Sequence, residues 1–209
     1  MSPPSNPSRL RLPGAAHYLM HCLDLLDIGQ LGNPTPCAGW DLRTLLHHLA
    51  DSIDALTEIL GTGQLSIEPP TAMRFHPDDL VLVESVRRRT VRLVESWGSA
   101  SAVAYAIGDR VLHGVDVECV AMIELAVHGW DVAQATRTGL PIPTPLAREL
   151  LPVARNVVPT TDRGPQFRDP VLEVRGGVPS DDLLGYLGRH PPPSAIAWNV
   201  PARKPSAGT

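Results

Sequence analysis

The stretch from Val117 to Ala135 constrains the fold more than any other part of the chain, because it is apolar at nearly every position. A helix that is apolar on all sides is typical of the buried middle of a domain. Glu124 and His128 stand four residues apart within it, so a helix places both side chains on one face, one turn apart. A buried carboxylate is unfavourable unless a cation or several donors contact it. The stretch therefore predicts a buried helix that carries either a metal site or a structural Glu–His or Glu–Arg pair.

Hydrophobic spacing predicts three more long helices around this one. β-favouring residues flank Gly108-Asp109 and predict a small hairpin, and two shorter helices are expected near the C-terminal end. Asp116 is the expected N-cap of the apolar helix and Gly139 its C-terminal stop. The fold class is thus all-α: a four-helix bundle with a short β-hairpin and a small C-terminal helical extension. The expected bounds are 10–28, 41–60, 77–97 and 116–139 for the long helices, 145–156 and 181–187 for the short ones, and 103–115 for the hairpin.

The length of 209 residues fits one domain with a real hydrophobic core. Residues 1–9 are rich in proline and serine and are expected to be disordered. Residues 191–209 form an expected flexible tail, which leaves residues 10–190 as the single helical domain.

Composition argues against several classes of partner. The net charge is -4, and the one basic cluster, Arg87-Arg88-Arg89, is interpreted as a solvated helix face, so no nucleic acid is expected. No apolar run is long enough to span a membrane, and the N-terminus has no signal-like core, so we expect a cytoplasmic protein. The three cysteines are widely spaced and predict neither a disulfide framework nor a zinc knuckle. The many apolar helix faces predict a homodimer.

A metal site at Glu124 and His128 wants a third ligand, and the second helix offers two adjacent histidines. At about 100° per residue, His47 falls on the polar face with Arg43 and Asp54, whereas His48 falls on the less polar flank. Helical geometry therefore favours His48 as the inward-facing histidine, although on spacing alone such a histidine is more often an ordinary interface residue than a ligand. The other histidines, His17, His21, His76, His113 and His190, remain open as candidates.

Three segments carry a resemblance to a known family. Residues 34–49 read PTPCAGWDLRTLLHHL, residues 124–133 read ELAVHGWDVA, and the C-terminal segments are FRDPV (167–171) and LLGYLGRHP (183–191). Together they resemble a single-domain branch of the mycothiol-dependent maleylpyruvate isomerase family, in the DinB/YfiT-like superfamily of metalloenzymes. The family pattern has a histidine eight residues after the Trp of the first segment, which here is His48. The resemblance implies a DinB-like bundle and a metal triad of His48, Glu124 and His128.

The same resemblance implies the chemistry. Such a triad suits zinc first, and also nickel or iron. The metal would activate a low-molecular-weight thiol, mycothiol, for S-transfer to, or isomerisation of, a small electrophilic substrate. Asp131 is either a partner of the His128 imidazole or a cap of surface groups. Two alternatives remain: a thiol-independent metal enzyme of a biosynthetic pathway (an epimerase, cyclase or hydrolase), and a non-catalytic metal- or ligand-binding module. The segment after Gly139 departs from the family pattern, because it has Pro141 and Pro143 where an acidic residue is common.

Overall fold

The computed structural model describes residues 11–65, 79–99, 104–107, 110–161, 163, 168–171 and 177–191. The predicted disordered segment 1–9 lies outside these residues, as does the predicted tail 191–209 except for its first residue.

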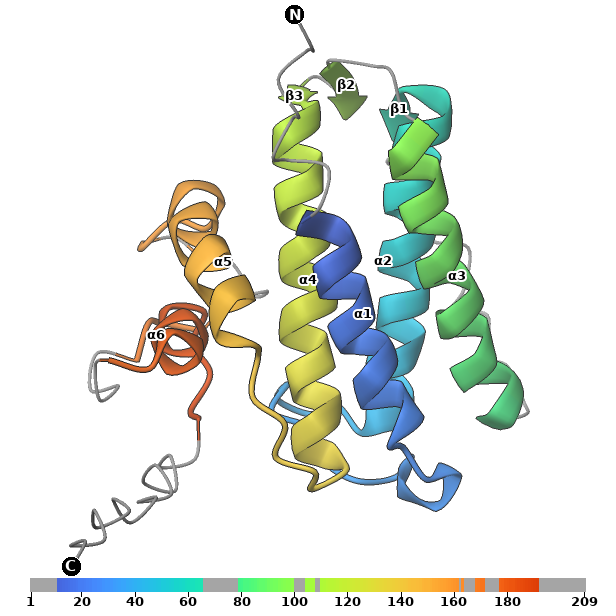
Figure 1. Ribbon diagram of the computed structural model, residues 1–209, viewed down its shortest axis with the longest axis vertical. Helices are drawn as coiled ribbons and strands as arrows, with labels where there is room; N and C mark the ends of the chain where they lie inside the picture. The colour runs from blue at the N-terminus through green and yellow to red at the C-terminus, as the bar shows by residue number, and fades with distance from the viewer. Residues whose placement is uncertain are drawn as a thin grey trace, which may run out of the picture.

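Four long helices form the bundle: α1 (Arg11–Asp24), α2 (Leu42–Thr62), α3 (Asp79–Ser99) and α4 (Gly114–Ala135) (Figure 1). Helix α4 packs against α1 and α2, and α3 packs against α2 and α1. The predicted all-α class with a four-helix bundle is confirmed. None of the described helices is both long and apolar enough to cross a bilayer.

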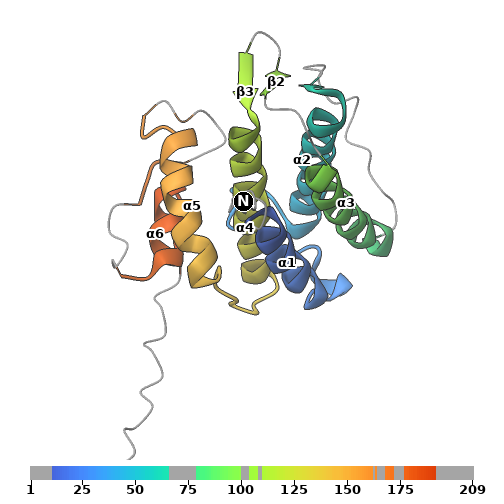
Figure 2. The ribbon, with the colours of Figure 1, turned by 45° about the horizontal axis from the view of Figure 1, so that its top comes forward.

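Two shorter helices, α5 (Thr144–Val157) and α6 (Pro179–Tyr186), form the C-terminal extension. They pack on each other, and α5 also packs on the side of α4 that faces away from α2 and α3 (Figures 1 and 2). Helix α4 is therefore covered on several sides, which explains why its sequence is apolar all round. Its buried residues include Leu125, Ala126 and Val132, none of which is exposed to solvent.

Three short strands lie at the end of the bundle where α4 begins: β1 (Gln64–Leu65), β2 (Ala104–Ile107) and β3 (Arg110–His113). Strands β2 and β3 pair in antiparallel fashion, as the predicted hairpin requires, and β1 pairs in parallel with β2. Strand β1 was not predicted, because two residues carry no alternating pattern.

The start of α2 sets the position of the histidine pair. Asp41 is the N-cap, and its carboxylate accepts a hydrogen bond from the Thr44 backbone N–H at 2.8 Å. The helix runs two residues past the predicted end at residue 60, and its C-cap is Gly63, which has φ 75°. Glycine is favoured there because a left-handed backbone is strained for other residues.

The start of α4 differs from the prediction. The helix begins at Gly114 with His113 as N-cap, so the expectation that Asp116 is the N-cap is wrong. Asp116 instead sits in the first turn, and its carboxylate accepts a hydrogen bond from the His113 backbone N–H at 3.1 Å. This is half of a capping box, which places the acidic residue at the third helical position rather than at the cap.

Candidate metal centre

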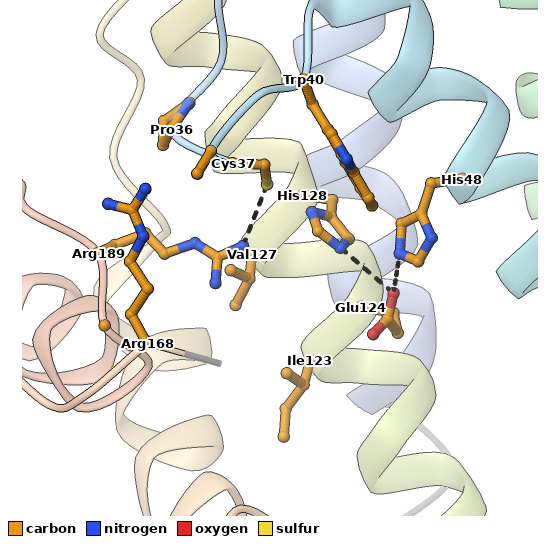
Figure 3. A pocket seen from close by; sticks show the side chains of 12 residues that line it. Pro36, Cys37, Trp40, His48, Ile123, Glu124, Val127, His128, Arg168 and Arg189 are labelled. Carbon is orange, nitrogen blue, oxygen red and sulfur yellow. Dashed lines mark hydrogen bonds and ion pairs between the residues drawn. The ribbon is translucent and has the colours of Figure 1, made fainter. Parts of the chain in front are cut away.

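Helices α2 and α4 bring His48, Glu124 and His128 together at one point (Figure 3). Glu124 Oε2 lies 3.5 Å from His48 Nε2 and 3.4 Å from His128 Nε2. One ligand atom of each residue lies within 4.8 Å of the other two. The i,i+4 spacing on α4 supplies two members, and the contact between α2 and α4 supplies the third.

The donor set has the features of a divalent-metal site. Glu124 Oε2 is buried and has no hydrogen-bond partner among the described residues. Both imidazole nitrogens lie at ion-pair distance from this oxygen, but neither makes a hydrogen bond to it. Two imidazole nitrogens and a carboxylate oxygen that converge without hydrogen-bonding one another suit a cation between them, with a position left open. The His48 nitrogen also lies 3.4 Å from the Ser52 hydroxyl, one turn further along α2.

His48 and its neighbour His47 differ from the helical-wheel expectation. His48 faces the site, but His47 is buried at 4% exposure, so its placement on a solvated face is wrong. The reason is that α3 covers this side of α2. Arg43, one turn before His47, forms an ion pair with Asp79 at the start of α3, and Asp54 further along the same face pairs with Arg89. A wheel shows which residues share a face, but it does not show which neighbouring helix covers that face.

The other histidines considered from the sequence do not join the site. His17, His21, His113 and His190 are exposed, and none of them belongs to a potential ligand group among the described residues. His76 lies outside the described residues.

The second ring nitrogen of His128, which faces away from Glu124, contacts a buried carboxylate. Its Nδ1 lies 2.9 Å from Asp131 Oδ2, one turn further along α4, and Asp131 has no exposed surface. This is the arrangement in which a carboxylate fixes the ring orientation of a metal-ligand histidine.

Arg189 and Cys37 complete this side of the site, and sequence reasoning missed both as site residues. Arg189 Nη2 lies 2.9 Å from Asp131 Oδ2, and Arg189 Nε lies 3.4 Å from Asp131 Oδ1. The Cys37 thiol donates to Asp131 Oδ2 at 3.3 Å. Its sulfur also lies 3.5 Å from Arg189 Nη2 (Figure 3). Both residues fall within the segments that carry the family resemblance, and this was the only signal available.

Electrostatics of the site follow from these contacts. Burial alone raises the pKa of Glu124, but the His128 and His48 imidazoles outweigh it and hold the pKa well below its usual range. Burial opposes the charged form of His128, whereas the hydrogen bond to Asp131 and the nearby Cys37 thiol and Glu124 carboxylate raise its pKa well above the usual value. Burial likewise raises the pKa of Asp131, and His128 with Arg189 lowers it overall. The site is therefore built around opposite charges in close contact.

A cavity of about 510 Å³ opens onto the three converging residues. Its wall combines the Pro36-Cys37-Ala38 loop and Trp40 with one face of α4 and with Arg168, Gly188 and Arg189 of the C-terminal extension. The Trp40 ring lies against His48 with ring centroids 4.9 Å apart, whereas Trp130 is buried at 3% exposure and serves packing. The volume lies within the range of small-molecule pockets.

Comparison with known proteins gives concordant matches. Residues 12–133 match the family described as mycothiol maleylpyruvate isomerase N-terminal domain. The uncharacterized proteins MT0763 and Rv0738 of Mycobacterium tuberculosis (strains CDC 1551 / Oshkosh and ATCC 25618 / H37Rv) are each 29% identical over 163 residues, or 77% of this chain and 85% of theirs.

Solved structures of mycothiol-dependent maleylpyruvate isomerase and of a histidine-to-alanine mutant of it each match with a TM-score of 0.54 at 20% identity. Each match covers 70% of this chain and 68% of the other. At that identity the likeness establishes the shared fold. The family match spans more than half of the chain and includes all three converging residues. The chain therefore belongs to the mycothiol maleylpyruvate isomerase N-terminal domain family.

Proposed function

We propose that the protein is a metal-dependent enzyme in which His48, Glu124 and His128 bind one divalent ion, with zinc as the first candidate and nickel or iron as alternatives. One observation carries the proposal: three ligand atoms within 4.8 Å converge at the wall of a cavity, and the buried Glu124 oxygen among them has no hydrogen-bond partner among the described residues. A structural Glu–His pair would instead be expected to close into short hydrogen bonds.

The proposed reaction uses a thiol. A divalent ion in this position lowers the pKa of a thiol or water that it binds, so that the deprotonated form is available at neutral pH. The family description and the structural relatives both name mycothiol, and we propose it as the co-substrate. The thiolate sulfur forms a bond to a carbon of a small electrophile, and the intact thiol either stays on the product as a thioether or is eliminated again after the double bond has isomerised.

The chain's own residues supply orientation and a confined environment. Glu124 and the two imidazoles fix the ion, and the Asp131 carboxylate holds the plane of the His128 ring. Trp40, Ile123 and Val127 form an apolar part of the cavity wall beside the triad, which limits the water that reaches a bound thiol.

We further propose that residues 10–190 form a single domain and that the protein is a cytoplasmic homodimer. Light scattering coupled to size-exclusion chromatography measures the mass in solution, and a monomer at working concentration would remove the homodimer from the proposal.

Turnover of a panel of small electrophiles by zinc-loaded protein, with and without mycothiol, tests the thiol chemistry. Products formed only with mycothiol support the proposal. Products formed equally without it indicate the thiol-independent enzyme. The variant Glu124→Gln distinguishes the binding module: loss of activity with an unchanged melting temperature of the metal-free protein supports catalysis, and loss of the stabilisation by zinc without loss of any activity indicates a structural ion.

A further inference from the structure

We propose that Arg189 is a positioning residue for the metal site, acting on His128 through Asp131. The inference rests on the proposed function, because it assumes that His128 is a metal ligand. It assigns a role at the site to the C-terminal extension, which lies outside the family match over residues 12–133.

The contact between Arg189 and Asp131 fixes the carboxylate in two directions. Nη2 of Arg189 lies 2.9 Å from Oδ2, and Nε lies 3.4 Å from Oδ1, so the planar guanidinium contacts both oxygens. A third nitrogen, Nη1, lies 3.4 Å from the Leu187 carbonyl oxygen. A carboxylate held in this way has little freedom to rotate, and it transmits its orientation to His128 Nδ1 at 2.9 Å.

Burial makes the arginine necessary. The Asp131 side chain has no exposed surface and that of Arg189 is 10% exposed. A histidine that ligates a metal ion does so as neutral imidazole. When the ion is bound, Arg189 is therefore the cation in contact with Asp131 among the described residues. A fully buried carboxylate without a cation is strongly unfavourable.

Local backbone geometry directs Arg189 inward. The chain turns after α6 at Gly188, which has φ 77°, and the Arg189 backbone N–H donates to the Leu184 carbonyl at 2.9 Å. A Cβ atom at Gly188 would lie 2.7 Å from the Arg168 carbonyl oxygen, so glycine is required on both counts. The turn thus carries the arginine to Asp131, while the next residue, His190, is exposed.

The position of Arg189 also decides between two ligand groups. Cys37, His128 and Asp131 bring one ligand atom each within 4.8 Å, as the triad does. Arg189 Nη2, however, contacts both Asp131 Oδ2 and Cys37 Sγ, so this place already holds a cation. The divalent ion is thereby directed to the Nε2 side of His128, where no arginine contacts Glu124 among the described residues.

The test measures zinc affinity by competition with a chromophoric chelator, and the visible absorption spectrum of the cobalt-loaded full chain, for Arg189→Gln, Asp131→Asn and the double variant. We expect Arg189→Gln to weaken zinc about 10-fold, within the roughly 10–100-fold range of outer-shell substitutions, and to shift the cobalt bands. In the Asp131→Asn background the same substitution changes zinc affinity less than 2-fold, because the coupling passes through Asp131. Arg189→Lys should bind zinc more tightly than Arg189→Gln but less tightly than the wild type, since lysine keeps the positive charge but not the planar group that contacts both carboxylate oxygens.

The matched control is Arg168→Gln. Arg168 lines the same cavity but is exposed and has no contact with Asp131 among the described residues, so zinc affinity and the cobalt spectrum stay unchanged. If Arg189→Gln destabilises the fold, the double variant removes the charge and its buried partner together and keeps the coupling measurable.

Two results overturn the inference while leaving the proposed function intact. In the first, Arg189→Gln binds zinc as tightly as the wild type and has the same cobalt bands. In the second, Arg189→Gln weakens zinc equally in the wild-type and in the Asp131→Asn background. A lower melting temperature with an unchanged cobalt spectrum also overturns it, because that marks a purely structural role. Failure of the wild type itself to bind zinc or cobalt overturns the proposed metal site, and the inference with it.

Discussion

The two sides of the His128 ring differ in how far their polar groups are satisfied. On the Nδ1 side, Asp131, Arg189 and Cys37 are linked by contacts of 2.9–3.5 Å, and a positive charge is already present. On the Nε2 side, a buried Glu124 oxygen faces two imidazoles at 3.4 and 3.5 Å and accepts no hydrogen bond among the described residues. A cluster of ligand-type residues is therefore a credible metal site only where no arginine or lysine side chain of the protein already provides the positive charge.

The largest effect is expected from Glu124→Gln, which removes the negative charge on the Nε2 side of His128, the open side. Zinc affinity should fall by more than about 100-fold, beyond what outer-shell substitutions produce. The metal-free protein should change little in stability, because glutamine keeps the shape of the side chain and Glu124 Oε2 accepts no hydrogen bond among the described residues. Chelator competition and thermal melting measure both. Retained affinity would mean that the open side does not hold the ion.

Separate substitutions of the two adjacent histidines on α2 test which of them contacts the ion. His48→Ala should abolish stoichiometric zinc binding with little change in stability. His47→Ala should keep zinc but lower the free energy of unfolding by about 1–3 kcal/mol, as expected for a buried polar residue. Denaturant unfolding and zinc titration of both variants are the measurements. The opposite assignment of the two effects would refute the placement of the third ligand.

Metal removal should destabilise the wild type moderately. Zinc at about 100 times its dissociation constant adds about 2.7 kcal/mol to the native state. Chelation should therefore lower the melting temperature by several degrees, and restored zinc should recover it. The same treatment of Glu124→Gln should have no effect. An equal response in that variant would place the ion elsewhere.

The smallest effect is expected on the satisfied side, from Cys37→Ser. A serine hydroxyl can still donate to Asp131, and the Arg189–Asp131 contact remains, so zinc affinity should change less than about 3-fold, below the range of outer-shell partners. Titration with zinc checks this. Loss of metal in Cys37→Ser would show that the ion sits in the Cys37 group, which would reverse the comparison of the two sides.

The sequence was most informative where one helix carries the pattern. The apolar run in α4 predicted burial, and the i,i+4 spacing placed Glu124 and His128 on one face, as the structure has them. The angular positions of the two histidines on α2 also favoured His48, which is the one that meets them. Its neighbour His47 was misplaced, because the α3 helix that covers it left no trace in the periodicity of α2.

Contacts between residues far apart in the chain could not be predicted from the sequence. Arg189 is 58 residues from Asp131 and reaches it through a glycine turn, so no spacing rule links the two. Cys37 meets the same carboxylate from a loop 94 residues away. Local patterns predict which residues a helix presents, whereas the chain fold decides which charges finally meet.

The most direct test of the metal triad is elemental analysis of the purified full chain beside His48→Ala, neither of them exposed to chelator. We expect about one zinc, nickel or iron per wild-type chain and none bound stoichiometrically in the variant. A wild type that holds no metal even after reconstitution with zinc would contradict this expectation, and would leave Glu124 and its two histidines as a partly exposed ionic cluster.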